Sequence, residues 1–414
     1  MVLERGFERL VRVKEAVNIL FKRFKDLEMP VEEVPITEAY GRIAACEIRA
    51  PIDVPPFTRS AVDGYALRAE ETFGASYHNP RRFRLLDQDA LLESPSGLPP
   101  LTAIKVLTGQ PIPPSLNAVV MLEAVERKDN VIEVYEPIPP LKNVSLTGED
   151  VRKGEVILRR GDIISPQLLG LLASCGLDTI SVYKKIKILI VSSGEELAKP
   201  GSPIGKYMCY DSSSYVIYGL ALKNYCVANI YPKAPIRTSK QDVIEALNYG
   251  VENYDITIFI GGSSIGSTDI IPHVLAEKGD LLFHGVAMKP GMPTAALEVQ
   301  GKPVYCLPGP PVAAFFSFIE LVKPLIEHIY RLRPPQKPLI RALLSRKISG
   351  EIGKRVYVRV NLKCREEIIE AEPLTAGGSG ILSSLCRAQG YIVLEENVDS
   401  LSEGDVVEVH LLEV

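Results

Sequence analysis

Residues 255–275 read DITIFIGGSSIGSTDIIPHVL, and this stretch sets the architecture of the middle of the chain. Ile256 to Ile260 is a short run of β-branched and aromatic residues, which is typical of an interior strand. Ile270 to Leu275, with Pro272 near its start, predicts the first turns of a helix. The stretch therefore predicts a strand, a glycine-rich loop and a helix in that order, which is the unit from which α/β domains are built.

The loop between this strand and helix is suited to an anion. Gly261 and Gly262 allow the backbone to turn tightly and to approach a ligand closely. The free N–H groups at the start of the following helix favour negative charge. Asp269 adds a carboxylate beside that anion, where a divalent cation would bridge the two. Further donors are the hydroxyls of Ser263, Ser264, Ser267 and Thr268.

The loop does not match the best-known phosphate-binding sequences. It lacks the Gly-Lys-Ser/Thr ending of a P-loop and the spacing of the dinucleotide fingerprint. From this loop alone, a glycine-rich turn with Ser, Thr and Asp capping that binds nothing remains an equal alternative.

The sequence around the loop alternates between strand-like and helix-like segments. IKILIVS (186–192), CVANIYP (226–232) and GKPVYCLPG (301–309) predict strands, as does LLFHGVAM (281–288). Helices are predicted at 211–225, where Asp211 or a neighbouring serine caps the start, at 239–254, and from Val312 to Leu332. This alternation predicts a doubly wound α/β domain with a mostly parallel sheet, in which ligands bind beyond the carboxyl ends of the strands.

The remaining sequence predicts β-rich units and one amphipathic helix. Short strand-like runs among prolines up to about Ile138 predict a compact β-rich domain. After the linker RPPQKP (333–338), further strand-like runs predict a small all-β domain. Apolar residues spaced by four and three predict a helix that uses one face for packing or dimerisation, namely Val13, Val17, Leu20, Phe24 and Leu27.

Composition and charge exclude several classes of protein. The 414 residues include 47 basic and 51 acidic side chains, giving a net charge of −4, and no basic cluster suggests a nucleic-acid surface. We find no signal-peptide core and no apolar stretch of membrane-spanning length. The seven cysteines contain no C-x-x-C pair, so neither a disulfide framework nor a zinc site is indicated. We therefore expect a cytoplasmic protein with no nucleic-acid or membrane partner.

Four polar loops follow strands of the predicted α/β domain and should meet at one edge of its sheet. Together they offer carboxylates at Glu196 and Asp269 and a cation at Lys289, which a phosphorylated ligand with a bridging divalent metal requires. Taken singly, Lys289 could be a solvated lysine, and Glu196 a carboxylate favoured by a helix dipole. The loops are Ser192–Leu197, Gly261–Asp269, Lys289–Pro293 and Leu307–Pro311.

These loops and several other segments resemble, in order, the motifs of the molybdopterin molybdenumtransferase family, which includes the MoeA proteins and the gephyrin E domain. PPFTRSAVDGYAL (55–67) resembles the family's Ser-Ala-Met-Asp-Gly-Tyr-Ala signature, and LTGQPIP (107–113) resembles Thr-Gly-Ala-Pro-x-Pro. GEDVRKGEVILRRG (148–161) matches a Gly-Glu-Asp segment. SSGEEL, GGSSIGSTD, AMKPGMP, CLPGPPVAA and GGSGILSSLCRAQGYIVL resemble further family motifs.

The resemblance implies an elongated homodimer with four domains in each subunit. It implies an N-terminal linking domain (1–48 and 146–184), a β-rich domain (49–145), an α/β molybdopterin-binding domain (185–332) and a C-terminal small β-barrel-like domain (333–414). The β-rich domain of one subunit is expected to face the α/β domain of the other. Other cofactor-biosynthesis proteins are possible partners.

The implied reaction is the insertion of molybdate or tungstate into adenylylated molybdopterin, with release of AMP and help from Mg²⁺. Carried over by position, the catalytic residues would be Asp63, Thr108, Asp150, Glu196, Asp269 and Lys289, with Glu196 and Asp269 binding the metal. The ligand-binding residues would be Ser193, Gly194, Asp211, Gly261, Gly262, Ser263, Ser264, Gly266, Pro290, Gly291, Pro308, Gly309, Pro311, Arg359 and Ser379.

The sequence departs from the family pattern in two adjoining loops. Met292 stands where the Lys-Pro-Gly-Lys-Pro loop has its second lysine, Pro310 replaces an asparagine, and Ala313 replaces a common serine. The loss of a cation and of polar groups from a desolvated site affects anion affinity strongly. These departures leave a non-catalytic pterin-binding scaffold open beside the transferase. A molybdopterin adenylyltransferase also stays open, because that enzyme has the same type of α/β domain.

Overall fold

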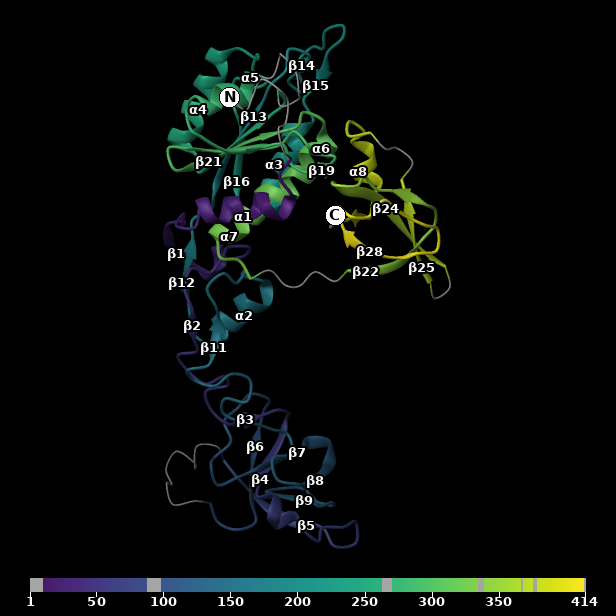
Figure 1. Cartoon of the computed structure of the whole chain (residues 1–414). Helices are drawn as coiled ribbons and strands as arrows, with labels where there is room; N and C mark the ends of the chain where they lie inside the picture. Colours follow the sequence, from purple (N-terminus) through teal and green to yellow (C-terminus); the bar gives the residue numbers. More distant parts are fainter. Residues whose placement is uncertain are drawn as a thin grey trace.

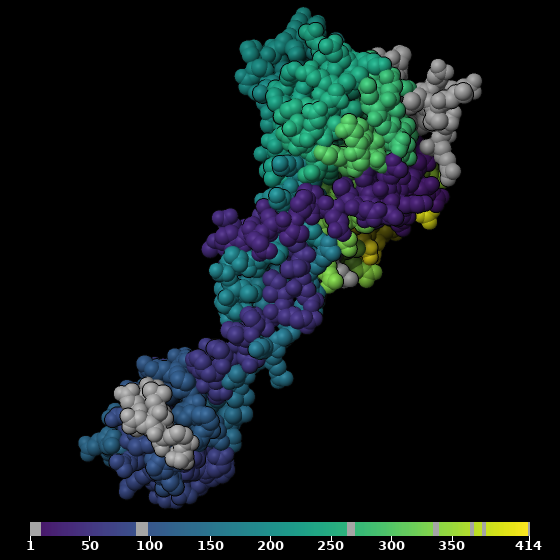
Figure 2. Space-filling model, turned by 90° about the vertical axis from the view of Figure 1, so that its left-hand side faces the viewer, coloured from purple at the N-terminus to yellow at the C-terminus, as the bar shows by residue number. Residues whose placement is uncertain are grey.

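The computed structural model describes residues 10–87, 98–262, 270–333, 339–365, 368–374 and 378–412. The molecule is elongated, with the α/β unit at one end, a β-rich unit at the other, and a C-terminal barrel beside the α/β unit (Figure 1). Figure 2 shows the narrow middle part, built from N-terminal segments and from residues that follow the β-rich unit. The predicted residues Ser263, Ser264, Gly266 and Asp269 lie outside the described ranges.

The α/β unit contains a six-stranded mixed sheet. Its first four strands are parallel, and the last two are added through antiparallel pairings, so that only the fifth strand runs in the opposite direction. This confirms the mostly parallel sheet expected from the sequence. In spatial order the strands are β16 (Val227–Ile230), β13 (Lys187–Ser192), β17 (Ile256–Ile260), β21 (Lys302–Leu307), β20 (Ala295–Val299) and β18 (Asp280–His284).

Both faces of this sheet are buried, which makes the unit doubly wound. Ile188 and Ile190 of β13 belong to one hydrophobic core, whereas Leu189 and Val191 belong to the other. Alternate side chains of a strand point to opposite faces, so a fully covered strand is apolar throughout. The first core includes residues of α1 (Val13–Arg23), α3 (Ser213–Lys223), α6 (Pro311–Ser317) and α7 (Lys323–Ile329), and the second includes α4 (Lys240–Asn253) and α5 (Ile270–Ala276).

The helix expected from Val312 to Leu332 is not regular throughout. A π-helical segment, Phe318–Val322, separates α6 from α7. Pro324 near the start of α7 has no N–H to donate. A wider turn before a proline is one way for a helix to continue past the missing hydrogen bond.

The C-terminal unit is a closed barrel. Its five strands are β24 (Arg355–Arg365), β25 (Ile368–Pro373), β22 (Ile340–Leu344), β28 (Val406–Leu411) and β26 (Gly390–Leu394), and β26 pairs back with β24. This confirms the small barrel expected from the sequence. One further strand, β19 (Met288–Lys289), comes from the α/β unit and pairs in parallel with β24. The α/β unit and the barrel are therefore joined by main-chain hydrogen bonds at this point.

The middle part brings together segments that are distant in the sequence. β1 (Val31–Pro35) pairs with β12 (Thr179–Tyr183), and β2 (Ile48–Arg49) pairs with β11 (Val156–Leu158). The helix α2 (Pro166–Ser174) covers this part. The domain boundaries assigned above stay predictions. None of the helices in the described ranges is long and apolar enough to cross a membrane.

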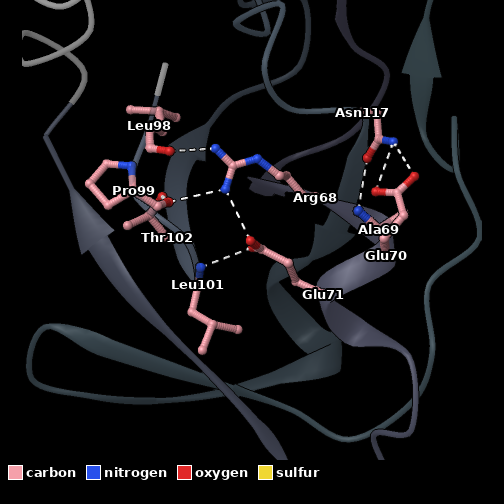
Figure 3. A network of polar contacts seen from close by, with 9 residues as sticks. All are labelled: Arg68, Ala69, Glu70, Glu71, Leu98, Pro99, Leu101, Thr102 and Asn117. Atoms are coloured by element: carbon pink, nitrogen blue, oxygen red, sulfur yellow. Dashed lines mark hydrogen bonds and ion pairs between the residues drawn. The ribbon is translucent and has the colours of Figure 1, made fainter. Parts of the chain in front are cut away.

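The β-rich unit is built on another six-stranded sheet. Its spatial order is β7 (Ala118–Met121), β4 (Gly64–Leu67), β6 (Thr102–Val106), β5 (Arg81–Leu86), β9 (Val131–Val134) and β8 (Val125–Lys128). A polar network fixes the entry to β6: Arg68 donates to the Pro99 carbonyl at 3.1 Å and to Glu71 at 3.0 Å, and Glu71 accepts from the Leu101 N–H at 3.0 Å (Figure 3). These bonds fix the start of β6, and Thr108 lies two residues beyond the end of the same strand.

Replacing Gly64 with alanine should destabilise the β-rich unit by about 3 kcal/mol, near the upper end of the usual cost of overpacking a core. Gly64 lies in the interior strand β4, between β7 and β6, where an added Cβ would sit 2.1 Å from the Val120 carbonyl oxygen and 2.8 Å from Val119 Cγ1. We expect a lower denaturant midpoint for the transition of this unit. Gly170→Ala is the matched control, because nothing lies within 4 Å of a Cβ there. Equal midpoints for both variants would contradict the packing described.

Candidate active site

A cavity of about 1100 Å³ opens at the carboxyl ends of β13, β17 and β21, where the α/β unit meets the barrel. We refer to it as the central cavity. The loops expected to converge do meet here, together with residues of β24. Thirteen of the predicted residues line it, namely Ser193, Glu196, Asp211, Gly261, Gly262, Lys289, Pro290, Gly291, Pro308, Gly309, Pro311, Arg359 and Ser379.

Glycines allow three of the loops to touch. Gly261 has a φ of +92°, which L side chains rarely adopt, and a Cβ there would lie 2.5 Å from the Ser193 carbonyl oxygen. A Cβ on Gly309 would in turn lie 3.6 Å from the Gly261 Cα. Hydrogen bonds from the Ser193 N–H to the Ile260 carbonyl (2.9 Å) and from the Gly261 N–H to the Leu307 carbonyl (3.0 Å) tie the same loops together.

The N-terminus of α3 also opens on this cavity. Asp211 is buried and its Oδ1 accepts from the Ser214 N–H at 3.0 Å, so it caps the helix as expected. Ser213 Oγ donates to the Gly309 carbonyl at 2.6 Å, which fixes α3 to the loop after β21. Ser212 and Ser213 line the cavity beside this helix start. The positive end of the helix dipole therefore favours an anion in the central cavity.

Buried polar groups at the cavity wall point to a polar ligand. Ser193 is 4% exposed, and its Oγ has no hydrogen-bond partner among the described residues. Buried polar atoms are nearly always paired in native proteins, so such a hydroxyl suits a bound ligand. Gly194 is not part of the lining, but its small size leaves room for the Glu196 carboxylate, which would lie 2.8 Å from a Cβ at this position.

The barrel contributes a buried cation. Arg359 of β24 is 7% exposed and lines the central cavity, and burial lowers the pKa of its guanidinium. An arginine stays protonated in proteins even so, so this side chain brings a positive charge into the cavity. Ser379 lies in the same wall, and its carbonyl accepts from the Val312 N–H of α6 at 3.0 Å. These two residues suit an oxyanion.

Two charged residues of the cavity were missed from the sequence. Lys289 Nζ donates to Glu351 Oε2 at 2.9 Å, and Glu351 also pairs with Lys354. Hydrogen bonds from Lys354 and then from Lys289 hold the pKa of Glu351 below its usual range. Nothing in the local sequence SGEIGKR singles out Glu351 or Lys354. Only the pairing of β19 with β24 brings them to Lys289.

Three predicted catalytic residues lie far from the central cavity of their own chain. Asp63 directly precedes β4 and Thr108 follows β6 of the β-rich unit, which lies at the opposite end of the molecule (Figure 1). Asp150 lies between β10 (Val144–Ser145) and β11 in the sequence, and none of the three lines the cavity. Asp63 Oδ1 accepts from the Thr108 N–H at 2.7 Å and from its Oγ1 at 2.8 Å. These bonds, the backbone one first, lower the pKa of Asp63 and keep it ionised. The Asp150 N–H donates to the Val54 carbonyl at 3.1 Å.

The described residues contain no cluster of three or more His, Cys, Asp or Glu side chains placed to hold a metal ion. Glu196 is the predicted metal ligand that the structure places in the central cavity. Mg²⁺ commonly binds through one or two carboxylates and the phosphates of a substrate, with water completing its shell. Glu196 beside a phosphate site therefore fits a magnesium that arrives with the substrate, while the other two carboxylates of the lining, Asp211 and Glu351, accept hydrogen bonds from protein groups.

Comparison with known proteins places the whole chain in one family. Residues 11–176 match the MoeA N-terminal region (domain I and II), residues 189–328 match the "Probable molybdopterin binding domain", and residues 341–412 match the MoeA C-terminal region (domain IV). These three regions correspond to the N-terminal half of the molecule, the α/β unit and the barrel.

Relatives and solved structures agree with these matches. Molybdopterin molybdenumtransferase 2 of Mycobacterium tuberculosis is 31% identical over 91% of this chain and 94% of its own. Molybdopterin molybdenumtransferase of Haemophilus influenzae is 30% identical over 94% of this chain and 98% of its own. The crystal structure of the molybdopterin biosynthesis MoeA protein from Pyrococcus horikoshii OT3 is 31% identical, with a TM-score of 0.81 over 97% of this chain and 100% of that chain. The chain therefore belongs to the MoeA family of molybdopterin molybdenumtransferases.

Proposed function

We propose that this protein is a transferase of molybdenum cofactor biosynthesis that inserts molybdate or tungstate into adenylylated molybdopterin and releases AMP. The observation that carries the proposal is the convergence of Lys289, Arg359 and the α3 N-terminus with Glu196 on one cavity. A pterin nucleotide and an oxyanion both need positive charge, and a magnesium bound to phosphates needs a carboxylate. The relatives named molybdenumtransferases favour this reaction over the adenylyltransferase and scaffold alternatives.

The residues that line the central cavity form two sets, one suited to phosphates and one suited to an oxyanion. Lys289, the α3 N-terminus and the glycine loops Gly261–Gly262 and Pro308–Gly309 suit the phosphates of the nucleotide. Arg359 and Ser379, which come from the barrel, suit the oxyanion that loads the dithiolene. Glu196 would hold Mg²⁺, which neutralises charge on the phosphoanhydride when it is bound. Attack of a water molecule on the phosphoanhydride would form a new P–O bond, break the bond between the two phosphates, and leave AMP and the phosphate monoester of the pterin.

A second copy of the chain completes the proposed site. Asp63 and Thr108 lie at the far end of the elongated molecule and are absent from the lining of the central cavity. If they act in the reaction, they reach the cavity of another molecule. We therefore propose a homodimer in which the β-rich unit of each subunit faces the central cavity of its partner.

The three residues that depart from the family motifs all line the central cavity, so they would be in a position to affect ligand binding there. Met292, Pro310 and Ala313 contribute no charge and no hydrogen-bond donor from their side chains. We propose that this wall adjusts the choice between molybdate and tungstate. Parallel assays with the two oxyanions measure that choice.

The proposed reaction is tested by following AMP release from adenylylated molybdopterin. We expect AMP to appear only when Mg²⁺ and molybdate or tungstate are both present. Removing Mg²⁺ with EDTA should stop the release, and excess Mg²⁺ should restore it. AMP release without any oxyanion, or consumption of ATP with free molybdopterin, would contradict the proposal and support a hydrolase or the adenylyltransferase.

A further inference from the structure

Two lysines from different units line the central cavity. Met292 is half-buried in the cavity wall, where similar loops carry a second lysine. Lys289 of the same loop remains. Lys354, from the turn that precedes β24 of the barrel, lines the same cavity. Two lysines therefore line the central cavity, and only Lys289 belongs to the loop Lys289–Pro293.

Glu351 holds the two lysines beside each other. Its Oε2 accepts from Lys289 Nζ at 2.9 Å, and its other oxygen pairs with Lys354. The side chain of Lys354 is 24% exposed, which is less than the 63% of Lys289. One carboxylate therefore neutralises part of the charge of two ammonium groups in a partly desolvated wall, where charge interactions exceed those in bulk water.

The backbone fixes this arrangement from both sides. The Lys354 N–H donates to the Glu351 carbonyl at 2.9 Å and closes a tight turn. The next residue, Arg355, donates its N–H to the Ala287 carbonyl at 2.9 Å, and β19 pairs with β24 directly beyond it. Lys354 is thus held against the loop that carries Lys289, and its position does not depend on the ion pair alone.

We propose that Lys354 is a second phosphate-binding residue of this site, which acts beside Lys289 and supplies positive charge from the barrel. Glu351 serves as the internal counter-ion in the free protein. When the phosphates of the pterin nucleotide enter, they pair with both ammonium groups and Glu351 turns away to solvent. This inference rests on the proposed function, because it assumes that a pterin nucleotide binds in the central cavity.

The test is equilibrium binding of adenylylated molybdopterin to the full-length protein, measured by titration calorimetry. We expect Lys354→Ala to weaken binding by about 10- to 50-fold, the usual effect of losing a charge-assisted hydrogen bond. Lys354→Arg should stay within a few-fold of the parent. Met292→Lys in the Lys354→Ala background should recover most of the affinity, because it returns a cation to the loop.

A matched control removes a lysine that forms a similar ion pair on the strand that follows Lys354. Lys363 of β24 pairs with Glu372 at 2.9 Å and lies outside the central cavity. Lys363→Ala should bind the nucleotide as the parent does. Thermal unfolding of all variants identifies any loss of fold, and we expect the midpoint of Lys354→Ala to lie close to that of Lys363→Ala, since both pairs are near the surface.

A purely structural role for Lys354 predicts a different pattern. If Lys354 only keeps Glu351 neutralised, Lys354→Ala should have no effect once Glu351 is changed to Gln. Direct binding predicts that Lys354→Ala weakens the nucleotide about as much in the Glu351→Gln background as in the parent. If the double variant binds the nucleotide as tightly as Glu351→Gln alone, the inference is wrong.

The two proposals fail in distinguishable ways. If the parent binds the nucleotide and releases AMP, but Lys354→Ala binds equally well, the role of Lys354 is wrong and the proposed function stands. If the parent neither binds the nucleotide nor releases AMP, the proposed function is wrong and the inference falls with it.

Discussion

Replacing Arg359 with alanine lowers the rate of oxyanion-dependent AMP release by about 100- to 1000-fold, the range expected when a preorganised group that stabilises a reacting oxyanion is removed. Arg359 is 7% exposed in the cavity wall, so its charge acts where water is largely excluded. The measurement is AMP release at saturating nucleotide with varied molybdate.

The control for this variant is another arginine of the same barrel. Arg341 of β22 is exposed and lies outside the central cavity, so Arg341→Ala should retain the parental rate. Arg359→Lys should retain only part of the rate, because an ammonium group lacks the planar two-pronged donor of arginine. A rate for Arg359→Ala within a few-fold of the parent would show that the oxyanion does not bind at this wall.

Replacing Asp63 with alanine lowers AMP release by about 100-fold or more, which is typical for loss of a positioned acid–base or ion-binding carboxylate. Asp63 is exposed, and its two hydrogen bonds from Thr108 keep it ionised and oriented although it lies far from the cavity of its own chain. A surface aspartate without a catalytic partner would not affect the rate. Asp87→Ala, at an exposed position of the same unit, should retain the parental rate.

The α/β unit could be predicted from the sequence because short, contiguous segments of the chain indicate its strands and loops. Strands buried on both faces are apolar throughout, as β13 and β17 are, and each is followed by a polar loop. Parallel strands place such loops at one edge, so the meeting of Ser193, Gly261 and Gly309 was predictable without coordinates. Gly261 stands where the backbones approach too closely for a Cβ.

Other features depend on contacts between distant segments and left no local signal. β20 was missed because its sequence, AALEV, is short and has no clear alternation. β19 is two residues long and becomes a strand only by pairing with β24 of the barrel. The same pairing creates the group of Lys289, Glu351 and Lys354, so those two barrel residues were missed as well.

The separation of Asp63 from the central cavity has a similar origin. The sequence shows that the PPFTRSAVDGYAL segment is unusual, but its place in space depends on the middle part, where β1 pairs with β12 and β2 pairs with β11. Those pairings hold the β-rich unit away from the α/β unit of the same chain (Figure 1). Composition and periodicity do not encode that distance.

The most direct measurement uses mixed dimers of the Asp63→Ala and Arg359→Ala chains, purified through two different tags. If each site combines the central cavity of one subunit with the Asp63 end of the other, the mixed dimer contains one site with both residues intact and one with neither. It should then release AMP at about half the parental rate, although each parent variant is nearly inactive. A mixed dimer no more active than the two variants would contradict a shared site.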